Sequence, residues 1–175
     1  MTISLKVEAT GVQDALARSP LVLRYVDQAL ATGAALIQRE AVRAAPKADG
    51  TLARNIQSGR LQVLLHQINS RAAHGAYVER GTGLYGPERR APGKGGLGTN
   101  GLANIAAWIR RRGITPRNGV TPAQLPFLIA RKIARDGTRA QPYLAPANNR
   151  QNAGRIADLV QAAARRGLTE AGLIR

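Results

Sequence analysis

The chain has 175 residues, of which 44% are hydrophobic and 21% are charged. This length supports a single domain (residues 1–175) with a real core, and the composition excludes both a strongly disordered and a fibrous chain. It contains no cysteine, which excludes disulfides, thiolate nucleophiles and cysteine-based zinc sites. No apolar run reaches the about 18 residues of a membrane helix, so we expect no membrane partner. His66 and His74 fall in no metal-binding spacing, so we expect no metal and no cofactor, and synthesis in a reducing cytoplasm is the default.

Lysine and arginine outnumber aspartate and glutamate by 26 to 10, a formal net charge of +16. The surplus is concentrated in residues 80–139, which carry 12 basic and 2 acidic side chains. Because so many like charges repel one another, a polyanion or an acidic protein is the natural partner. Few aromatic residues are available to stack on bases, so nucleic acid would be contacted through its phosphates. The candidate DNA- or partner-facing residues are Arg89, Arg90, Lys94, Arg110, Arg111, Arg112, Arg131, Lys132, Arg135 and Arg139.

In chain order, the pattern first predicts a strand over residues 2–8 and a short helix over 12–17. Ser19-Pro20 then has the form of a helix start, and apolar residues repeat every three to four positions as far as Ala45-Pro46. We therefore expect one long amphipathic helix of about 25 residues, roughly 37 Å in length. Such a helix would span the whole domain.

Two strands are predicted next, over residues 52–58 and 60–70, and Gly59 between them suggests a hairpin turn. A further short strand is predicted over residues 76–79. Residues 81–101 then contain 8 of the chain's 19 glycines, which indicates a long loop. We place function in its basic, glycine-rich part, residues 83–100, because long loops in compact domains are usually functional.

The remaining pattern predicts helices. One apolar stripe begins at Leu102 and ends at Gly113, and a second helix ends at Asp136-Gly137. The prolines of residues 142–146 prevent a continuous helix there and introduce a last helix, followed by a loose tail at residues 165–167. Mixed in this way, the elements predict an α+β fold.

Motifs that would indicate catalysis fail on their context. Residues 81–86 match the dinucleotide-binding pattern GxGxxG, but Pro87 follows where a helix should open. Glu79 and Glu88 are the acidic residues near the loop, and Glu79 is expected to pair with an arginine. His66 is expected to be a hydrogen-bonded structural residue. The sequence therefore predicts no enzyme.

Three segments resemble the tail-completion or neck family of long-tailed bacteriophages, a family of minor tail components that join tail to head. Residues 39–56 resemble the family's helix, "AP", short loop and entry to a strand; residues 76–82 resemble its "Y-V-E-x-G-T" element; and residues 129–147 resemble its "G-T-x-A-x-P-F-L-x-P-A" stretch. The structural residues of these two motifs are Tyr77, Glu79, Gly81, Thr82, Gly137, Thr138, Pro142, Tyr143, which replaces the family's phenylalanine, and Pro146.

The resemblance implies a small antiparallel sheet packed against the long helix. It also implies a structural virion protein that forms a ring, with six subunits expected and twelve as the alternative, around the channel for double-stranded DNA. Its partners would then be copies of itself, head-completion or connector proteins, and tail-terminator or tail-tube proteins. Within the motifs, residues 79–82 are expected to end a strand. Tyr143 and Leu144 are expected to pack in the core, with docking on a neighbouring subunit as the alternative.

The charge alone leaves a second interpretation open. A free-standing accessory protein that binds double-stranded DNA without sequence preference would carry the same basic region. A nuclease ranks below both, because metal-dependent cleavage requires clustered carboxylates that this region lacks.

Overall fold

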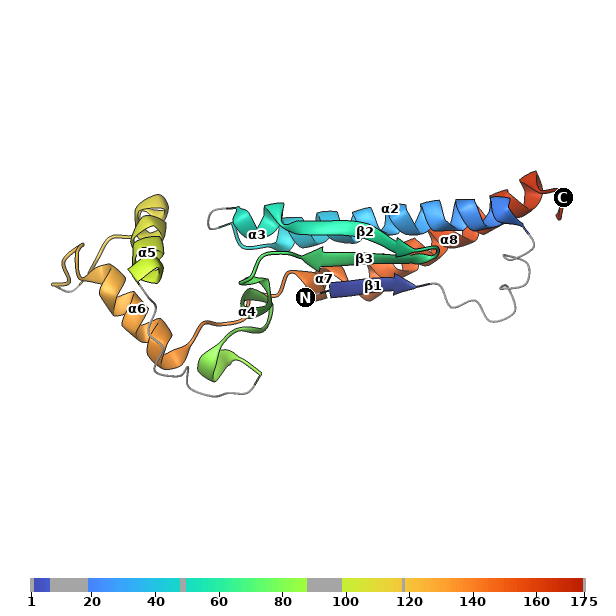
Figure 1. The fold of residues 1–175 in the computed structure, drawn as a ribbon. Helices are drawn as coiled ribbons and strands as arrows, with labels where there is room; N and C mark the ends of the chain where they lie inside the picture. Colours follow the sequence, from blue (N-terminus) through green and yellow to red (C-terminus); the bar gives the residue numbers. More distant parts are fainter. Residues whose placement is uncertain (1, 7–18, 48–49, 88–98, 118, 175) are drawn as a thin grey trace.

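The structure is a computed structural model that describes residues 2–6, 19–47, 50–87, 99–117 and 119–174 (Figure 1). Along the chain the elements are β1 (Thr2–Lys6), α2 (Pro20–Ala44), α3 (Thr51–Arg54), β2 (Ile56–Gln62), β3 (Leu65–Ser70), α4 (Gly75–Arg80), the 3-10 helix η1 (Gly83–Tyr85), α5 (Thr99–Arg112), α6 (Leu125–Asp136), α7 (Leu144–Ala147) and α8 (Arg150–Glu170). The α+β class is confirmed. The helix predicted over residues 12–17 lies outside the described residues.

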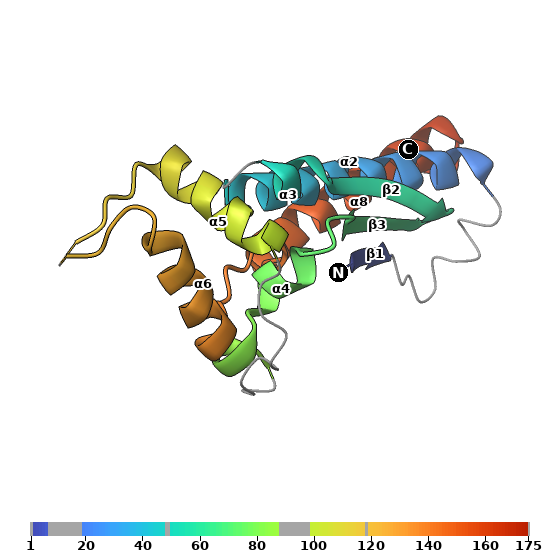
Figure 2. The same ribbon diagram turned by 60° about the vertical axis from the view of Figure 1, so that its left-hand side comes forward.

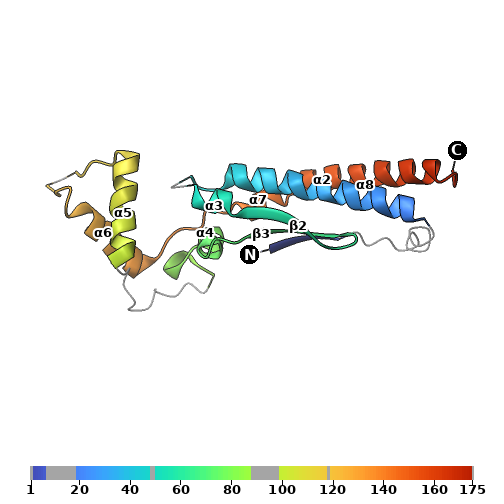
Figure 3. The same ribbon diagram turned by 45° about the horizontal axis from the view of Figure 1, so that its top comes forward.

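The molecule has two parts, a layered body and a helical arm. In the body, α2 and α8 lie side by side and the sheet covers one side of them, as Figure 3 shows. The arm consists of residues 99–136, in which α5 and α6 pack against each other (Figure 2). It extends away from those layers (Figure 1), with a hydrogen bond of 3.5 Å from Arg112 at the end of α5 to the Lys47 carbonyl oxygen.

Helix α2 begins and ends where the sequence predicts. The hydroxyl of Ser19 accepts a hydrogen bond from the Val22 amide at 3.4 Å, and Pro20 lies in the first turn, where its missing N–H costs nothing. Ala45 turns to an extended conformation immediately before Pro46, because a residue that precedes proline avoids helical geometry. The 25-residue helix buries its apolar stripe between the sheet and α8.

The sheet of the described strands is antiparallel in the order β1-β3-β2, so the predicted hairpin of β2 and β3 is confirmed. Its turn is not at Gly59, which lies inside β2 opposite Gln67; the chain reverses at Leu64, which has φ 59°. The Leu64 amide donates to Asp27 Oδ1 at 2.9 Å, and this bond helps to hold the unusual backbone of a non-glycine residue. The predicted strand start was also early, because residues 51–54 form α3.

The strand predicted over residues 76–79 is wrong, because this segment is helix α4. The Val78 amide donates to His74 O at 3.0 Å and the Gly81 amide to Tyr77 O at 2.8 Å. Val78 packs on the core while Tyr77 is 63% exposed. A four-residue apolar–polar alternation fits either a strand or a helix turn, and packing decided between them.

The predicted loose tail at residues 165–167 is also wrong, since α8 continues to Glu170. Gly167 allows α8 to approach α2 closely, with an imagined Cβ only 2.8 Å from Val22 Cα. The Tyr25 hydroxyl on α2 donates to Glu170 Oε2 at 2.6 Å, and Arg166 pairs with the same carboxylate at 2.9 Å. Contacts with α2 therefore hold the end of α8 in place.

Candidate functional site

Two chain passages connect the body to the arm, and they form a neck of paired backbone at Gly81-Thr82 and Gly137-Thr138. The Thr82 amide donates to Thr138 O at 2.8 Å, and the Thr138 amide donates to Thr82 Oγ1 at 2.9 Å. Gly137 has φ 87°, and a Cβ there would collide with the Thr82 carbonyl oxygen. The two Gly-Thr pairs are thus required by the close approach of the passages.

Glu79 secures the body side of this neck. Its side chain is buried, and its carboxylate accepts hydrogen bonds from the backbone amides of Tyr143 at 2.7 Å, Leu144 at 3.0 Å and Ala145 at 2.9 Å. The arginine partner expected from the sequence is wrong. A buried carboxylate needs several donors, and the free amides at the start of α7 supply them.

The resemblance motifs combine buried and exposed residues: Glu79, Gly81, Gly137 and Tyr143 are buried. Tyr143 and Leu144 are fully buried, as predicted, and they share one core with Ala45, Leu52 and Ile56. The motif prolines, Pro142 and Pro146, and the motif tyrosine, Tyr77, are exposed. Residues 79–82 do not end a strand; they end α4 and begin the neck.

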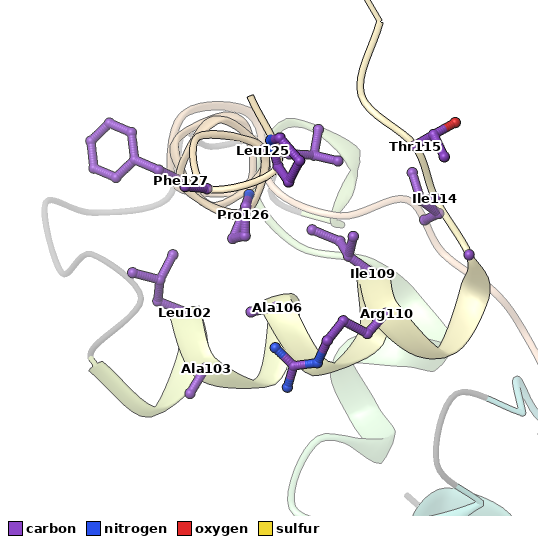
Figure 4. Close-up of a pocket in the computed structure, with 13 residues that line it drawn as sticks. Leu102, Ala103, Ala106, Ile109, Arg110, Ile114, Thr115, Leu125, Pro126 and Phe127 are labelled. Carbon is purple, nitrogen blue, oxygen red and sulfur yellow. The ribbon is translucent and has the colours of Figure 1, made fainter. Parts of the chain in front are cut away.

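The arm holds an open groove of about 810 Å³ between α5 and α6. Figure 4 shows Leu102, Ala106 and Ile109 of α5 on one side, with Pro126 of α6 and the residues beside it on the other. The remaining lining is supplied by Ala103, Arg110, Gly113, Ile114, Thr115, Pro122, Ala123, Leu125 and Phe127. The groove is therefore predominantly apolar, with one guanidinium among its lining residues.

The apolar side chains of the arm are incompletely buried. Among those that the structure describes in α5 and α6, only Ile109 falls in the buried class, at 8% exposed. Phe127 is 60% exposed, Leu128 44% and Leu102 36%. Two helices of 14 and 12 residues that bury so little bring little stability of their own, so this surface is suited to contact with another molecule.

The predicted basic residues that the structure describes gather on and beside the arm. Arg110, Arg111 and Arg112 form the exposed last turn of α5, where the helix dipole favours positive charge. Arg131 is exposed on α6, and Arg139 follows α6 with its guanidinium 5.4 Å from the Tyr85 ring centre. Arg89, Arg90 and Lys94 lie outside the described residues, as does most of the loop expected to carry function.

Two of the predicted basic residues share one carboxylate, that of Asp136. Arg135 Nε lies 2.6 Å from Asp136 Oδ1, and Lys132 Nζ lies 3.0 Å from Asp136 Oδ2. The hydrogen bond from Arg135, which has the larger effect, and the one from Lys132 hold the pKa of Asp136 well below its ordinary value. Lys132 and Arg135 are therefore less available to an outside partner than Arg110 and Arg111, while Arg112 lies 3.5 Å from the Lys47 carbonyl oxygen.

The other polar cluster belongs to the body. Asp27 Oδ1 lies 3.2 Å from Nε2 of the buried His66, as a structural histidine was expected to be placed, and Asp27 Oδ2 lies 3.1 Å from Arg60 Nε. Within the described part of the chain, no group of three or more histidine, aspartate and glutamate residues could hold a metal ion. Nor does any described helix combine the length and apolarity that a membrane span needs.

Comparison with protein-family models, curated proteins and solved structures found no match to this chain. The candidate site is therefore defined by geometry, as the arm with its groove and basic turn. Sequence reasoning found the arm's helices and charges but missed the groove. The apolar residues that line the groove, from Leu102 to Ile109 and Phe127, are visible in the sequence. The sequence near them does not show that α6 leaves these residues partly exposed.

Proposed function

We propose that this chain is a structural virion protein that forms a ring at the head–tail junction, or neck, of a long-tailed bacteriophage and catalyses no reaction. In this role it completes the tail and joins it to the head around the DNA channel. Its partners are copies of itself, in a ring of six or twelve, and the connector and tail proteins above and below.

The observation that carries this proposal is the meeting of the three resembling segments in one unit. Leu52 and Ile56 of the first segment share a core with Tyr143 of the third. Glu79 of the second segment binds the backbone of residues 143–145 through three hydrogen bonds. Segments that resemble one family and also depend on one another for packing support a shared fold, and the function follows by analogy.

The arm adds support of a different kind. It extends from the body with exposed apolar side chains such as Phe127 and Leu128 and with a basic last turn on α5. Exposed apolar patches beside basic residues are typical of surfaces that bind other macromolecules. A component that works between neighbours in a particle would have such a surface.

Electron microscopy of particles that carry this protein, with an antibody label against it, tests the proposal. We expect the label at the neck, and cross-linking of the particles to yield multimers of the chain. Light scattering of the pure protein over a range of concentrations is a second measurement. A protein that is monomeric in solution and also absent from particles would rule the proposal out.

A second function, sequence-independent binding of duplex DNA by the isolated chain, is favoured by the exposed Arg110–Arg112 turn and the net charge of +16. It predicts tight binding that falls steeply as salt rises, because each phosphate contact releases a counterion. Electrophoretic mobility shifts with a duplex, measured at low and moderate salt, test it. If no complex forms even at low salt, this second function is excluded.

A further inference from the structure

The groove between α5 and α6 is shaped for side chains that project from a helix. Figure 4 shows Leu102 and Ala106 on one side and Pro126 and Phe127 on the other, with open space between them. A volume of about 810 Å³ is enough for several apolar side chains. An amphipathic helix places such side chains three to four residues apart, which is how a helix fills a groove of this kind.

The charge around the groove selects the partner. Arg110 lines the groove, and the same basic turn continues through Arg111 and Arg112. Residues 99–136 contain seven basic residues and a single acidic one, Asp136, which already pairs with Lys132 and Arg135. The arm therefore supplies no free carboxylate to its own basic turn, and complementary charge has to come from outside.

This charge disfavours a second copy of the chain as the occupant. Residues 99–136 carry seven basic residues against one acidic residue, so two arms brought together would face like-charge repulsion, and contacts between copies in a ring would use other surfaces. Duplex DNA is disfavoured for a different reason. Phosphates would satisfy the arginines, but they would leave the apolar floor of the groove and the exposed Phe127 unfilled.

We propose that the groove of the arm binds an acidic amphipathic helix of a different protein. Its apolar face lies between Leu102 and Phe127, and its carboxylates face the Arg110–Arg112 turn. The inference rests on the proposed function and deepens it, since it gives the chemistry of a neighbouring protein at the head–tail junction. It does not depend on ring formation, and it can be tested on the full-length protein alone.

The probe is a synthetic helix of about 14 residues with leucines on one face and glutamates elsewhere. Fluorescence anisotropy of the labelled peptide reports binding, and the emission of Trp108, the chain's one tryptophan, gives a second readout on α5. We expect a dissociation constant of about 1–100 μM. The same peptide with lysines in place of the glutamates should bind at least about tenfold more weakly, because its charges are repelled.

Matched variants locate the site. F127D and R110E should each weaken binding of the glutamate peptide by about tenfold. F127D puts a charge into the apolar lining of the groove, and R110E reverses a charge that faces the peptide's glutamates. L61D, on an exposed leucine of β2, and R155E, on the exposed face of α8, are the controls and should leave affinity unchanged. R110E should also improve binding of the lysine peptide. Circular dichroism and melting of each variant verify that the fold is intact.

Several results would overturn the inference. One is no binding of the glutamate peptide at about 1 mM; another is equal weakening by L61D and F127D. Self-association that F127D abolishes would identify a second copy as the occupant, and a duplex of about 20 base pairs that loses affinity with both arm variants would identify nucleic acid. Rings without peptide binding would refute only this inference, and peptide binding by a monomer absent from particles would refute only the proposed function.

Discussion

At the scale of single residues, Glu79 determines how the neck is attached to the body. One buried carboxylate receives three backbone amides from residues 143–145, a segment whose helix α7 is only four residues long. The first amides of a helix have no partner inside it, so a carboxylate at this place acts as a cap from a distant part of the chain. Glu79 is therefore structural.

We predict that Glu79→Gln lowers the free energy of unfolding by about 1.5–3 kcal/mol. The charge-assisted hydrogen bonds of the carboxylate become weaker neutral ones, and the NH₂ group of the glutamine side chain faces a backbone amide that is also a donor. Urea denaturation measures the change. Glu40→Gln on α2 is the control: Glu40 pairs loosely with Arg43 at 3.6 Å, and its loss should cost less than about 0.5 kcal/mol. Equal effects of the two variants would show that Glu79 is not a cap.

Glycines of this chain have opposite roles at different positions. Gly137→Ala should destabilise by about 2 kcal/mol or more, because φ of 87° is strained for alanine and the new Cβ meets the Thr82 carbonyl. Gly154→Ala should stabilise by about 0.5–1 kcal/mol, since Gly154 lies on the exposed face of α8 with open space around it. Thermal melts of both variants show whether the signs differ, and a neutral Gly137→Ala would contradict the close approach at the neck.

At the scale of elements, the pairing of α2 with α8 depends on small residues. A Cβ at Gly33 on α2 would lie 2.9 Å from Ile156 Cγ1 on α8, and Gly167 on α8 allows a similar approach to Val22. Close-packed interiors transmit such small changes of volume, so these positions set the distance between the two helices.

A double-mutant cycle tests this packing. Gly33→Ala alone should destabilise by about 1 kcal/mol, because overpacking against Ile156 outweighs the gain in helix propensity. In an Ile156→Ala background the same change should become stabilising by up to about 1 kcal/mol, since space for the methyl group is then present. Denaturant unfolding of the four proteins gives the coupling energy. Additive effects would mean that the two residues do not touch in solution.

At the scale of the whole molecule, stability is divided unevenly between the body and the arm. The body buries Leu30, Ile37 and Ile68 almost completely between α2, α8 and the sheet. The arm buries only Ile109 among the apolar residues described in its helices. The free energy of local unfolding rises with the apolar area that a segment buries. The arm should therefore unfold locally at a lower free energy than the body.

We therefore predict that the amides of α5 and α6 exchange with deuterium faster than those of α2 and β3, by about 100-fold or more at neutral pH. Exchange followed by mass spectrometry measures this for each segment. Addition of the glutamate peptide should slow exchange in α5 and α6 and leave β3 unchanged. Uniform protection of arm and body would contradict the view that the arm is completed by a partner.

Local signals in the sequence were sufficient for a large part of the fold. The cap at Ser19-Pro20, the apolar repeat and the break at Ala45-Pro46 together determine α2, because each acts over one or two turns of helix. The antiparallel hairpin follows from an equally local pattern of strand residues, although its turn lies at Leu64 and not at Gly59. The basic character of residues 80–139 is a matter of composition and needs no structure.

Other features depend on residues far apart in the chain. Residues 76–79 form a helix where a strand was predicted, and Glu79 receives the backbone amides of residues 143–145 in place of an arginine. The hairpin turn lies not at Gly59 but at Leu64, where a hydrogen bond from the Leu64 amide to Asp27, 37 residues earlier, helps to hold it. The charge, the long helix and the α+β class could be predicted from the order of the residues alone. The paired Gly-Thr segments, the groove and the close pairing of α2 with α8 arise from contacts between distant segments, since burial is a property of what packs together and not of any one segment.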